Sequence, residues 1–397
     1  MNFRLMAAAA AGILAVAGTA NADEALTNAS TLSALGAQVR LHIGTAANPT
    51  TLGDAALSQI IADQFSVLTP ENDMKWQVVE PTQGNLNWTG ADNLVNFAEQ
   101  HGQLVRGHTL MWHNQLPNWL TQGVASGTIS ASQLRDLLRQ HIAIEVGRYR
   151  GKIWQWDVVN ELLADANPSQ IRPNDFWVSN LGPGIVADAF RWAHAADPEA
   201  LLCYNDYNIA GEDGSNAKHN AAVALIKSLQ AEKAPIGCVG DQGHLDLQFG
   251  FNQIQMTQDL QEFASLGLKV AITEADVRTF VETMDTNQGP VVSPTDPTPS
   301  HTADAAATDW YIGMLQSCLT VKACISFTVW GFADSHSWVP GTFNGEGDAD
   351  LYDVNLNPKP QFTGVQQTLL LARGAPNRGR LHDGDRDHDG DDHHDRD

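Results

Sequence analysis

Hydrophobic and polar positions along the chain follow two alternating periods. Short apolar runs, which we expect to form buried strands, are separated by longer amphipathic segments with the period of a helix. The expected strands are residues 41–46, 66–72, 104–112, 153–161, 201–208, 236–244, 268–276 and 324–332. The expected helices include residues 91–102, 131–151, 185–197, 215–233, 251–267 and 302–320, with 360–374 closing the series. Eight strand-then-helix units are what one (β/α)8 barrel requires.

A doubly wound open sheet is the competing architecture, and the polar residues distinguish the two. Reactive and hydrogen-bonding side chains gather where the expected strands end: Glu71, Asn72, His108, Trp112, Asn160, Glu161, Asn205, Tyr207, Gln242, His244, Glu274, Asp276 and Trp330. In a barrel these ends form one ring around one pocket, whereas an open sheet would spread them along a line. The sequence therefore predicts an α/β protein built as a single (β/α)8 TIM barrel.

Both ends of the chain differ in composition from the barrel. Residues 1–22 have a positive start at Arg4, an apolar run and a small-residue cleavage site, and so predict a signal peptide. The apolar run is too short to span a membrane, so we expect a secreted protein, extracellular or periplasmic, with its catalytic barrel domain at residues 23–381. Residues 382–397 have eight Asp, four His and no apolar side chain, and we expect them to be a disordered tail.

Two further segments have no place in the barrel pattern. Residues 283–301, with four prolines, predict an extended surface loop beside the active face. Within the tail, Asp385, Asp387 and Asp389 fit the first half of a calcium-loop pattern, but Arg396 stands where a bidentate glutamate is expected. A solvated charge run is therefore the preferred interpretation of the tail, with loose divalent-metal binding as the alternative.

Composition narrows the class of partner. The chain has 46 acidic and 23 basic residues, a net charge of −23, which argues against nucleic acid and anionic membrane surfaces and is compatible with a neutral polymer. Four cysteines in an exported chain suggest two disulfides, although three pairings are formally possible. Cys318 and Cys324 are close enough for a local bridge, and adjacent strands would bring Cys203 to Cys238. The alternative is that all four are simply small buried side chains.

Two glutamates at strand ends carry the main chemical signal. Glu161 ends one expected strand and Glu274 ends another, some 113 residues later. Glycosidic bond cleavage with retention needs two such carboxyl groups, one to protonate the leaving oxygen and one to attack the anomeric carbon. Beside Glu161, Asn160 offers an amide that could bind a sugar hydroxyl. His244 and Asp276 would form a hydrogen-bond chain that orients Glu274 and keeps it ionised.

Aromatic side chains supply the second signal. Three of the eleven tryptophans, Trp112, Trp330 and Trp338, lie at or just after strand ends, where flat indole faces can stack on sugar rings. Most of the others have neighbours that are consistent with core packing. The sequence therefore predicts a carbohydrate-binding cleft with aromatic walls.

Seven motifs in a fixed order carry a family resemblance. They are Gly44-Thr-Ala46, Thr69-Pro-Glu-Asn-Asp-Met-Lys-Trp76, Arg106-Gly-His-Thr-Leu-Met-Trp-His-Asn-Gln-Leu-Pro117, Trp156-Asp-Val-Val-Asn-Glu161, Tyr204-Asn-Asp-Tyr-Asn208, Thr273-Glu274 and Thr328-Val-Trp-Gly331. With them the chain resembles the glycoside hydrolase family 10 endo-β-1,4-xylanases over about residues 35–371.

The resemblance implies a role for each matching residue. It makes Glu161 the acid/base and Glu274 the nucleophile of a retaining reaction on xylan and xylo-oligosaccharides, with no cofactor. It implies that Glu71, Asn72 and Lys75 hold the sugar two units to the non-reducing side of the cleavage point. The sugar at that point would be surrounded by His108, Trp112, Asn160, Gln242, His244, Trp330 and Trp338. Tyr207 would lie on the leaving-group side, and both disulfides resemble those seen in members.

Some alternatives remain open at this stage. The same chemistry on a β-1,4-glucan is the nearest one, because a single sequence does not locate the atoms that would exclude glucose. A sugar-binding protein without catalysis is a different class, disfavoured because both glutamates occur together with His244 and Asp276. For the enzyme we expect a monomer with its two carboxyl groups about 5 to 5.5 Å apart, while more than about 6.5 Å would indicate inversion.

Overall fold

Eight parallel strands form a closed barrel in the computed structural model, which describes residues 30–165, 170–211, 216–285, 289–292 and 301–373. The barrel strands are β1 (His42–Ala47), β2 (Val67–Pro70), β3 (Leu104–Trp112), β4 (Gln155–Asn160), β5 (Leu201–Asp206), β6 (Cys238–Asp241), β8 (Lys269–Phe280) and β11 (Cys324–Val329). Each pairs with the next in this order, and β11 pairs in parallel with both β8 and β1. This last pairing closes the ring and excludes the open sheet.

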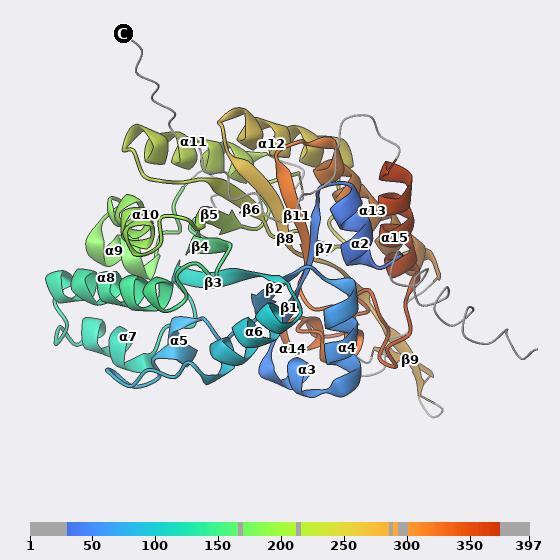
Figure 1. The fold of residues 1–397 in the computed structure, drawn as a ribbon, viewed down its shortest axis with the longest axis horizontal. Coiled ribbons are helices and arrows are strands. Elements are labelled where there is room, and N and C mark those ends of the chain that lie inside the picture. Colours follow the sequence, from blue (N-terminus) through green and yellow to red (C-terminus); the bar gives the residue numbers. More distant parts are fainter. Residues whose placement is uncertain (1–29, 166–169, 212–215, 286–288, 293–300, 374–397) are drawn as a thin grey trace, which may run out of the picture.

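Helices surround the barrel on the outside (Figure 1). They are α2 (Leu32–Gln38), α3 (Pro49–Gly53), α4 (Ala55–Gln64), α5 (Trp76–Val79), α6 (Thr89–Gln100), α7 (Asn118–Ala125), α8 (Ala131–Arg148), α9 (Phe176–Leu181), α10 (Ile185–Ala196), α11 (Ala217–Ala231), α12 (Gln253–Ser265), α13 (His301–Thr320), α14 (Val339–Thr342) and α15 (Pro360–Ala372).

The longest helix on the side of β3 and β4 shows how sequence determines these elements. Helix α8 begins after Ser130, whose hydroxyl accepts from the Gln133 amide while the Gln133 side chain accepts from the Ser130 amide. This capping box satisfies amide groups that the first helical turn leaves unpaired. Leu134, Leu138 and Ile142 recur every four residues, so they form one stripe, and all three are buried against the barrel.

All eight expected strands and all seven expected helices are confirmed in place, with two differences at strand ends. The strand expected at 236–244 stops at Asp241, because Gly243 has a positive φ of 76°, and a short strand β7 (His244–Asp246) follows beside β8. Strand β8 runs past Asp276 to Phe280, where it pairs with β12 (Glu346–Gly347). The active face is therefore extended above these two strands.

The segment after β8 corrects one expectation. In place of a loop throughout 283–301, β9 (Glu282–Asp285) and β10 (Gly289–Val292) pair as antiparallel strands. Backbone pairing there satisfies amide and carbonyl groups that a plain loop would leave to solvent. The expected signal peptide at 1–22 and the tail at 382–397 lie outside the described residues and stay predictions. No helix in the described part of the chain is long and apolar enough to cross a lipid bilayer.

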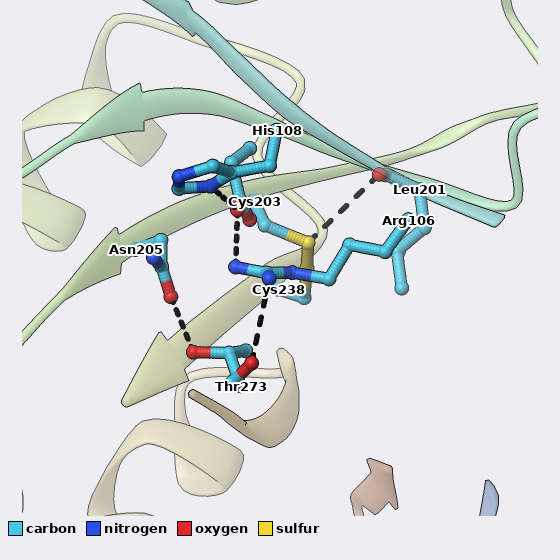
Figure 2. The surroundings of a disulfide bond; sticks show 8 residues. Arg106, His108, Leu201, Cys203, Asn205, Cys238 and Thr273 are labelled. Carbon is cyan, nitrogen blue, oxygen red and sulfur yellow. Dashed lines mark hydrogen bonds and ion pairs between the residues drawn. A yellow bond between two sulfur atoms is a disulfide. The ribbon is translucent and has the colours of Figure 1, made fainter. Parts of the chain in front are cut away.

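Both expected disulfides are present. Cys203 on β5 lies directly opposite Cys238 on β6 in the strand register and is bonded to it, with 4.5 Å between the Cα atoms. Cys318 near the end of α13 is bonded to Cys324 at the start of β11. The alternative of four unpaired buried cysteines is therefore wrong. Figure 2 shows this first disulfide with Arg106, His108 and Asn205 in its surroundings.

Candidate active site

The carboxyl ends of the strands open into one cleft of about 860 Å³. Of the expected catalytic and binding residues, Glu71, Asn72, Lys75, His108, Trp112, Glu161, Tyr207, Gln242, His244, Glu274, Trp330 and Trp338 line it. Asn160 and Asp276 are not part of the lining, and both are almost completely buried beneath it. The barrel thus brings together groups that lie up to 267 residues apart in the chain.

Glu161 is held by three uncharged donors. Its carboxyl group accepts from Trp112 Nε1 at 2.8 Å, Gln242 Nε2 at 3.0 Å and Asn160 Nδ2 at 3.2 Å. Its backbone has a positive φ of 54°, a conformation that costs free energy for a residue with a side chain. Burial, together with the charges of Asp206 and Glu274, raises the pKa of Glu161, while the hydrogen bonds from Gln242 and Trp112 oppose that rise. A raised pKa favours a carboxyl group that keeps its proton.

Glu274 has charged neighbours. It accepts from Asn205 Nδ2 at 2.7 Å and contacts His244 Nε2 at 3.3 Å, and Arg106 lies 3.6 Å from its Oε1. Burial alone would raise the pKa of Glu274. The hydrogen bond from His244 and the electrostatic interactions with His108, His244 and Arg106 outweigh burial and lower this pKa well below its usual value. The carboxylate is therefore ionised.

A buried carboxylate keeps His244 protonated. Asp276 Oδ2 lies 2.8 Å from His244 Nδ1 and accepts from Trp338 Nε1 at 2.7 Å. Burial lowers the pKa of His244, but the charge of Asp276 and the hydrogen bonds to Asp276 and Glu274 raise it to about 10. The expected chain from Glu274 through His244 to Asp276 is thus present as contacts, and the imidazolium donates from both of its nitrogens.

Two amides connect the carboxyl groups beneath the cleft. Asn205 Nδ2 donates to Glu274 and also to Asn160 Oδ1 at 2.8 Å, and Asn160 in turn donates to Glu161. The orientation of Asn205 is fixed, because Thr273 Oγ1 donates to Asn205 Oδ1 at 2.7 Å (Figure 2). A continuous hydrogen-bond path therefore sets the relative position of Glu161 and Glu274.

The floor of the cleft contains one group of possible metal ligands. His108, Asp157 and Glu274 offer ligand atoms within 4.8 Å of one another. However, Arg106 pairs with Asp157 and also lies beside Glu274, so a fixed cation already neutralises these carboxylates. His108 Nδ1 lies 2.8 Å from Asp157, and burial lowers the pKa of His108. A second cation here would face the guanidinium, so the donor set does not fit a resident metal ion.

One end of the cleft is polar. Asn48 Nδ2 donates to Glu71 at 2.6 Å, and Lys75 Nζ donates to Asn72 Oδ1 at 3.1 Å. Lys75 also lies over the ring of Trp112, 4.8 Å from its centroid. Burial lowers the pKa of Lys75, whereas the nearby glutamates oppose this change. These fixed donors and acceptors suit the hydroxyl groups of one sugar.

The other end contains Tyr207 within a network of charges. Tyr207 Oη donates to Asp165 at 2.6 Å and accepts from Arg172 at 3.1 Å, and Lys218 Nζ lies 3.5 Å from the ring centroid. The ring is thereby held at the cleft wall. Its hydroxyl group is occupied by protein partners, so the aromatic face is what it offers to a ligand.

Several features of the site were not expected from the sequence. Asn205 lies at a strand end, but only its two hydrogen bonds reveal that it connects the carboxyl groups. Arg106 is buried in the barrel, where it pairs with Asp157 and also faces Glu274. The cleft lining further includes Asn114, Gln115, Asn208, Leu245, Asp246, Phe249, Gly250, Arg278, Thr342 and Phe343. Most of these lie beyond the expected strand ends, so a search confined to those ends misses them.

Comparison with known proteins gives a consistent result. The model of glycosyl hydrolase family 10 matches residues 31–368. An endo-1,4-beta-xylanase of Agaricus bisporus is 37% identical over 326 residues, which are 82% of this chain and 90% of that protein. Endo-1,4-beta-xylanase B of Thermotoga neapolitana is 36% identical over 341 residues, 85% of this chain and 91% of that protein. The crystal structure of xylanase 10B from Thermotoga petrophila RKU-1 in complex with xylobiose superimposes with a TM-score of 0.77 at 34% identity, covering 86% of this chain and 98% of that chain.

Proposed function

The chain belongs to glycosyl hydrolase family 10 and is a glycoside hydrolase, and we propose that it hydrolyses internal β-1,4 bonds of xylan and xylo-oligosaccharides. One observation carries the proposal: the carboxyl groups of Glu161 and Glu274 line one cleft and have pKa values displaced in opposite directions. Glycosidic cleavage by double displacement needs one protonated and one ionised carboxyl group. The names of the relatives and the xylobiose bound to one of them support xylan as the substrate.

The proposed reaction has two steps. Glu161 gives its proton to the leaving oxygen while Glu274 attacks the anomeric carbon, which breaks the glycosidic bond and forms a glycosyl-enzyme ester. Glu161, now ionised, takes a proton from a water molecule that attacks the same carbon and releases Glu274. Two inversions leave the configuration retained. The second step restores the proton on Glu161, so the cycle balances without a cofactor.

The remaining expected residues receive binding or positioning roles in this proposal. Glu71, Asn72 and Lys75 would hold a sugar on the non-reducing side, and Tyr207 would contact the sugar on the leaving side. Around the reacting sugar we place His108, Trp112, Gln242, His244, Trp330 and Trp338. The amide of Asn160 is engaged by Glu161 and Asn205, so we assign it to positioning Glu161 rather than to direct sugar contact. Asp276 supports His244 in the same way.

We also propose that the enzyme is exported and acts as a monomer. Two disulfides among the described residues support export, because such bonds persist in oxidising compartments. A monomer suffices, because this one chain supplies every group of the cleft described above. The mass and N-terminal sequence of the protein recovered outside producing cells would test cleavage after Ala22, and light scattering would test the oligomeric state.

Sugar release tests the proposed function. The purified protein should release reducing ends from xylan and far fewer from carboxymethyl-cellulose, and Glu274→Ala should abolish release. Comparable cleavage of both polymers would change the assignment to a β-1,4-glucanase, and release from neither would indicate a binding protein. Proton NMR of the first product formed from xylohexaose should show the β-anomer, whereas an initial α-anomer would contradict double displacement.

A further inference from the structure

Phe249 is an exposed aromatic side chain at the rim of the cleft. Its exposed fraction is 77%, and Phe280 at 50% is the other phenylalanine that is largely exposed in the described part of the chain. Of these two, Phe249 lines the cleft and Phe280 does not. Leaving a ring of this size in water forgoes about 1.5–3 kcal/mol of burial free energy. A ring held in that position is therefore available to a ligand in the cleft.

The barrel topology places Phe249 at the opposite end of the cleft from the polar subsite. In the ring of eight strands, β2 and β6 lie four positions apart and so face each other across the barrel axis. Glu71 directly follows β2, and Phe249 follows β6 and β7. Glu161, after β4, and Glu274, on β8, lie between these two ends. A chain that runs from Glu71 past the carboxyl groups thus leaves toward Phe249.

A continuous wall leads from the reacting carboxylate to this end. His244 contacts Trp338 at 4.9 Å between ring centroids, and Trp338 contacts Phe343 at 5.4 Å. The Arg278 guanidinium lies over the Phe343 ring, 3.9 Å from its centroid. Phe343 and Arg278 both line the cleft. The surface beyond Trp338 is therefore a rigid extension of the site.

Ion pairs fix the turn that carries Phe249. Arg278 is paired with Asp246 at 3.1 Å and with Glu346 at 2.8 Å, so its charge is already neutralised. The Phe249 amide donates to the Asp246 carbonyl at 3.0 Å, and Gln248 Nε2 donates to Asp246 Oδ2 at 3.3 Å. The ring thus stands on an anchored turn, and the charged groups beside it are held in ion pairs. What this end offers a ligand is an apolar face without free charge.

We infer that Phe249 is the stacking platform of a further sugar subsite, which binds a xylosyl unit on the leaving side beyond the unit at Tyr207. This inference rests on the proposed function and deepens it. The ring face suits the C–H face of an uncharged pyranose, as aromatic faces suit other flat apolar surfaces. The subsite is remote from the reacting bond, so it acts on long chains and leaves short substrates unaffected.

Truncation of the ring tests the subsite, with a matched control in the same protein. Phe249→Ala should lower kcat/KM on xylohexaose by about three- to tenfold, the loss expected for one aromatic contact. It should leave kcat/KM on an aryl β-xylobioside unchanged, because that substrate ends at the first leaving-side position. Phe249→Trp should restore activity on xylohexaose. Phe280→Ala removes an exposed ring outside the cleft and should match the wild type on both substrates.

The outcomes separate this inference from the proposed function. If the wild type cleaves xylohexaose but Phe249→Ala and Phe280→Ala behave alike on both substrates, the subsite is refuted and the xylanase assignment stands. An equal loss on the aryl xylobioside would also refute it, because the ring would then act on the reaction centre. A wild type that cleaves neither xylan nor xylohexaose would overturn the proposed function and the subsite together.

Discussion

Replacing Asp276 by Asn should change the pH dependence of the first chemical step. Asp276 is completely buried, and one of its oxygens contacts both His244 Nδ1 and Trp338 Nε1. Asparagine keeps the shape and can present its carbonyl oxygen to both donors, but it removes the negative charge. Above its own pKa, His244 would then keep its proton on Nδ1 and present an unprotonated Nε2 to the carboxylate of Glu274.

The size of the effect follows from the pKa of His244. The difference between 6.5 and about 10 corresponds to roughly 5 kcal/mol in favour of the imidazolium. The charge of Asp276 is the largest favourable influence, and burial acts in the opposite direction, so the pKa of His244 should fall from about 10 toward its usual 6.5 in the variant. The hydrogen bond from His244⁺ to Glu274 is then lost at neutral pH. Loss of one such charged hydrogen bond should lower kcat/KM about ten- to hundredfold.

An activated substrate isolates this titration from that of the acid. With 2,4-dinitrophenyl β-xylobioside the leaving group needs no proton, so Glu161 does not shape the profile of kcat/KM. The wild-type profile should stay level from pH 6 to pH 9, whereas Asp276→Asn should fall as pH rises above about 6.5. Trp338→Phe removes the other hydrogen-bond donor to Asp276 and keeps the Asp276 carboxylate, so its profile of kcat/KM should show no such decrease above pH 6.5. A variant profile parallel to the wild type would refute the role of the Asp276 charge.

Three further predictions concern the acid, the imidazolium and the disulfides. Glu161→Gln should lose about 10²- to 10⁴-fold in kcat/KM on xylan and much less on the dinitrophenyl substrate; equal losses on both would contradict its role as the acid. The pKa of His244 in the folded state lies above its value in the unfolded chain. Its contribution to the free energy of unfolding should therefore be complete below about pH 6.5 and lost as pH approaches 10. Urea titrations over this pH range should show a smaller loss of unfolding free energy in Asp276→Asn than in the wild type. Replacing both cysteines of a disulfide by alanine should lower the free energy of unfolding by roughly 4 kcal/mol for the bond between β5 and β6, which closes the longer loop, and by roughly 2 kcal/mol for the bond between α13 and β11. If urea unfolding gives the larger loss for the bond between α13 and β11, the loop-length argument is refuted.

Much of the fold could be predicted because its signals are local. Strands buried on both faces read as short apolar runs, and the helices between them have an apolar stripe, as Leu134 and Leu138 show in α8. Closure of the ring follows from the number of units. The end of a strand is less visible, because Gly243 stops one strand through its backbone and β8 continues past Asp276 through its pairing with β12. Neither effect changes the hydrophobic pattern.

The site could be predicted as a set of residues but not as a network. Strand-end positions identified Glu161, Glu274 and about half of the cleft lining. The link through Asn205 depends on a pairing between side chains 45 and 69 residues apart, which no local pattern encodes. Phe249 was missed for another reason. It follows the strand end by several residues, on a turn whose position depends on Arg278 and its ion pairs.

The two glutamates differ in chemistry because their donors differ in charge. Among the described residues, every side chain that donates to the carboxyl group of Glu161 is neutral: one indole and two amides. Such donors orient the carboxyl group and offset the effect of burial on its pKa only in part, so the protonated form is favoured. Glu274 is more deeply buried, but His244 and Arg106 bring positive charge within 3.6 Å of it, so its ionised form is favoured. Since Asn160 and Asn205 connect the two groups, the barrel fixes their geometry with neutral amides and assigns their roles with cations. A variant that changes charge should therefore alter which group holds the proton, and one that changes an amide should alter how the two groups are aligned.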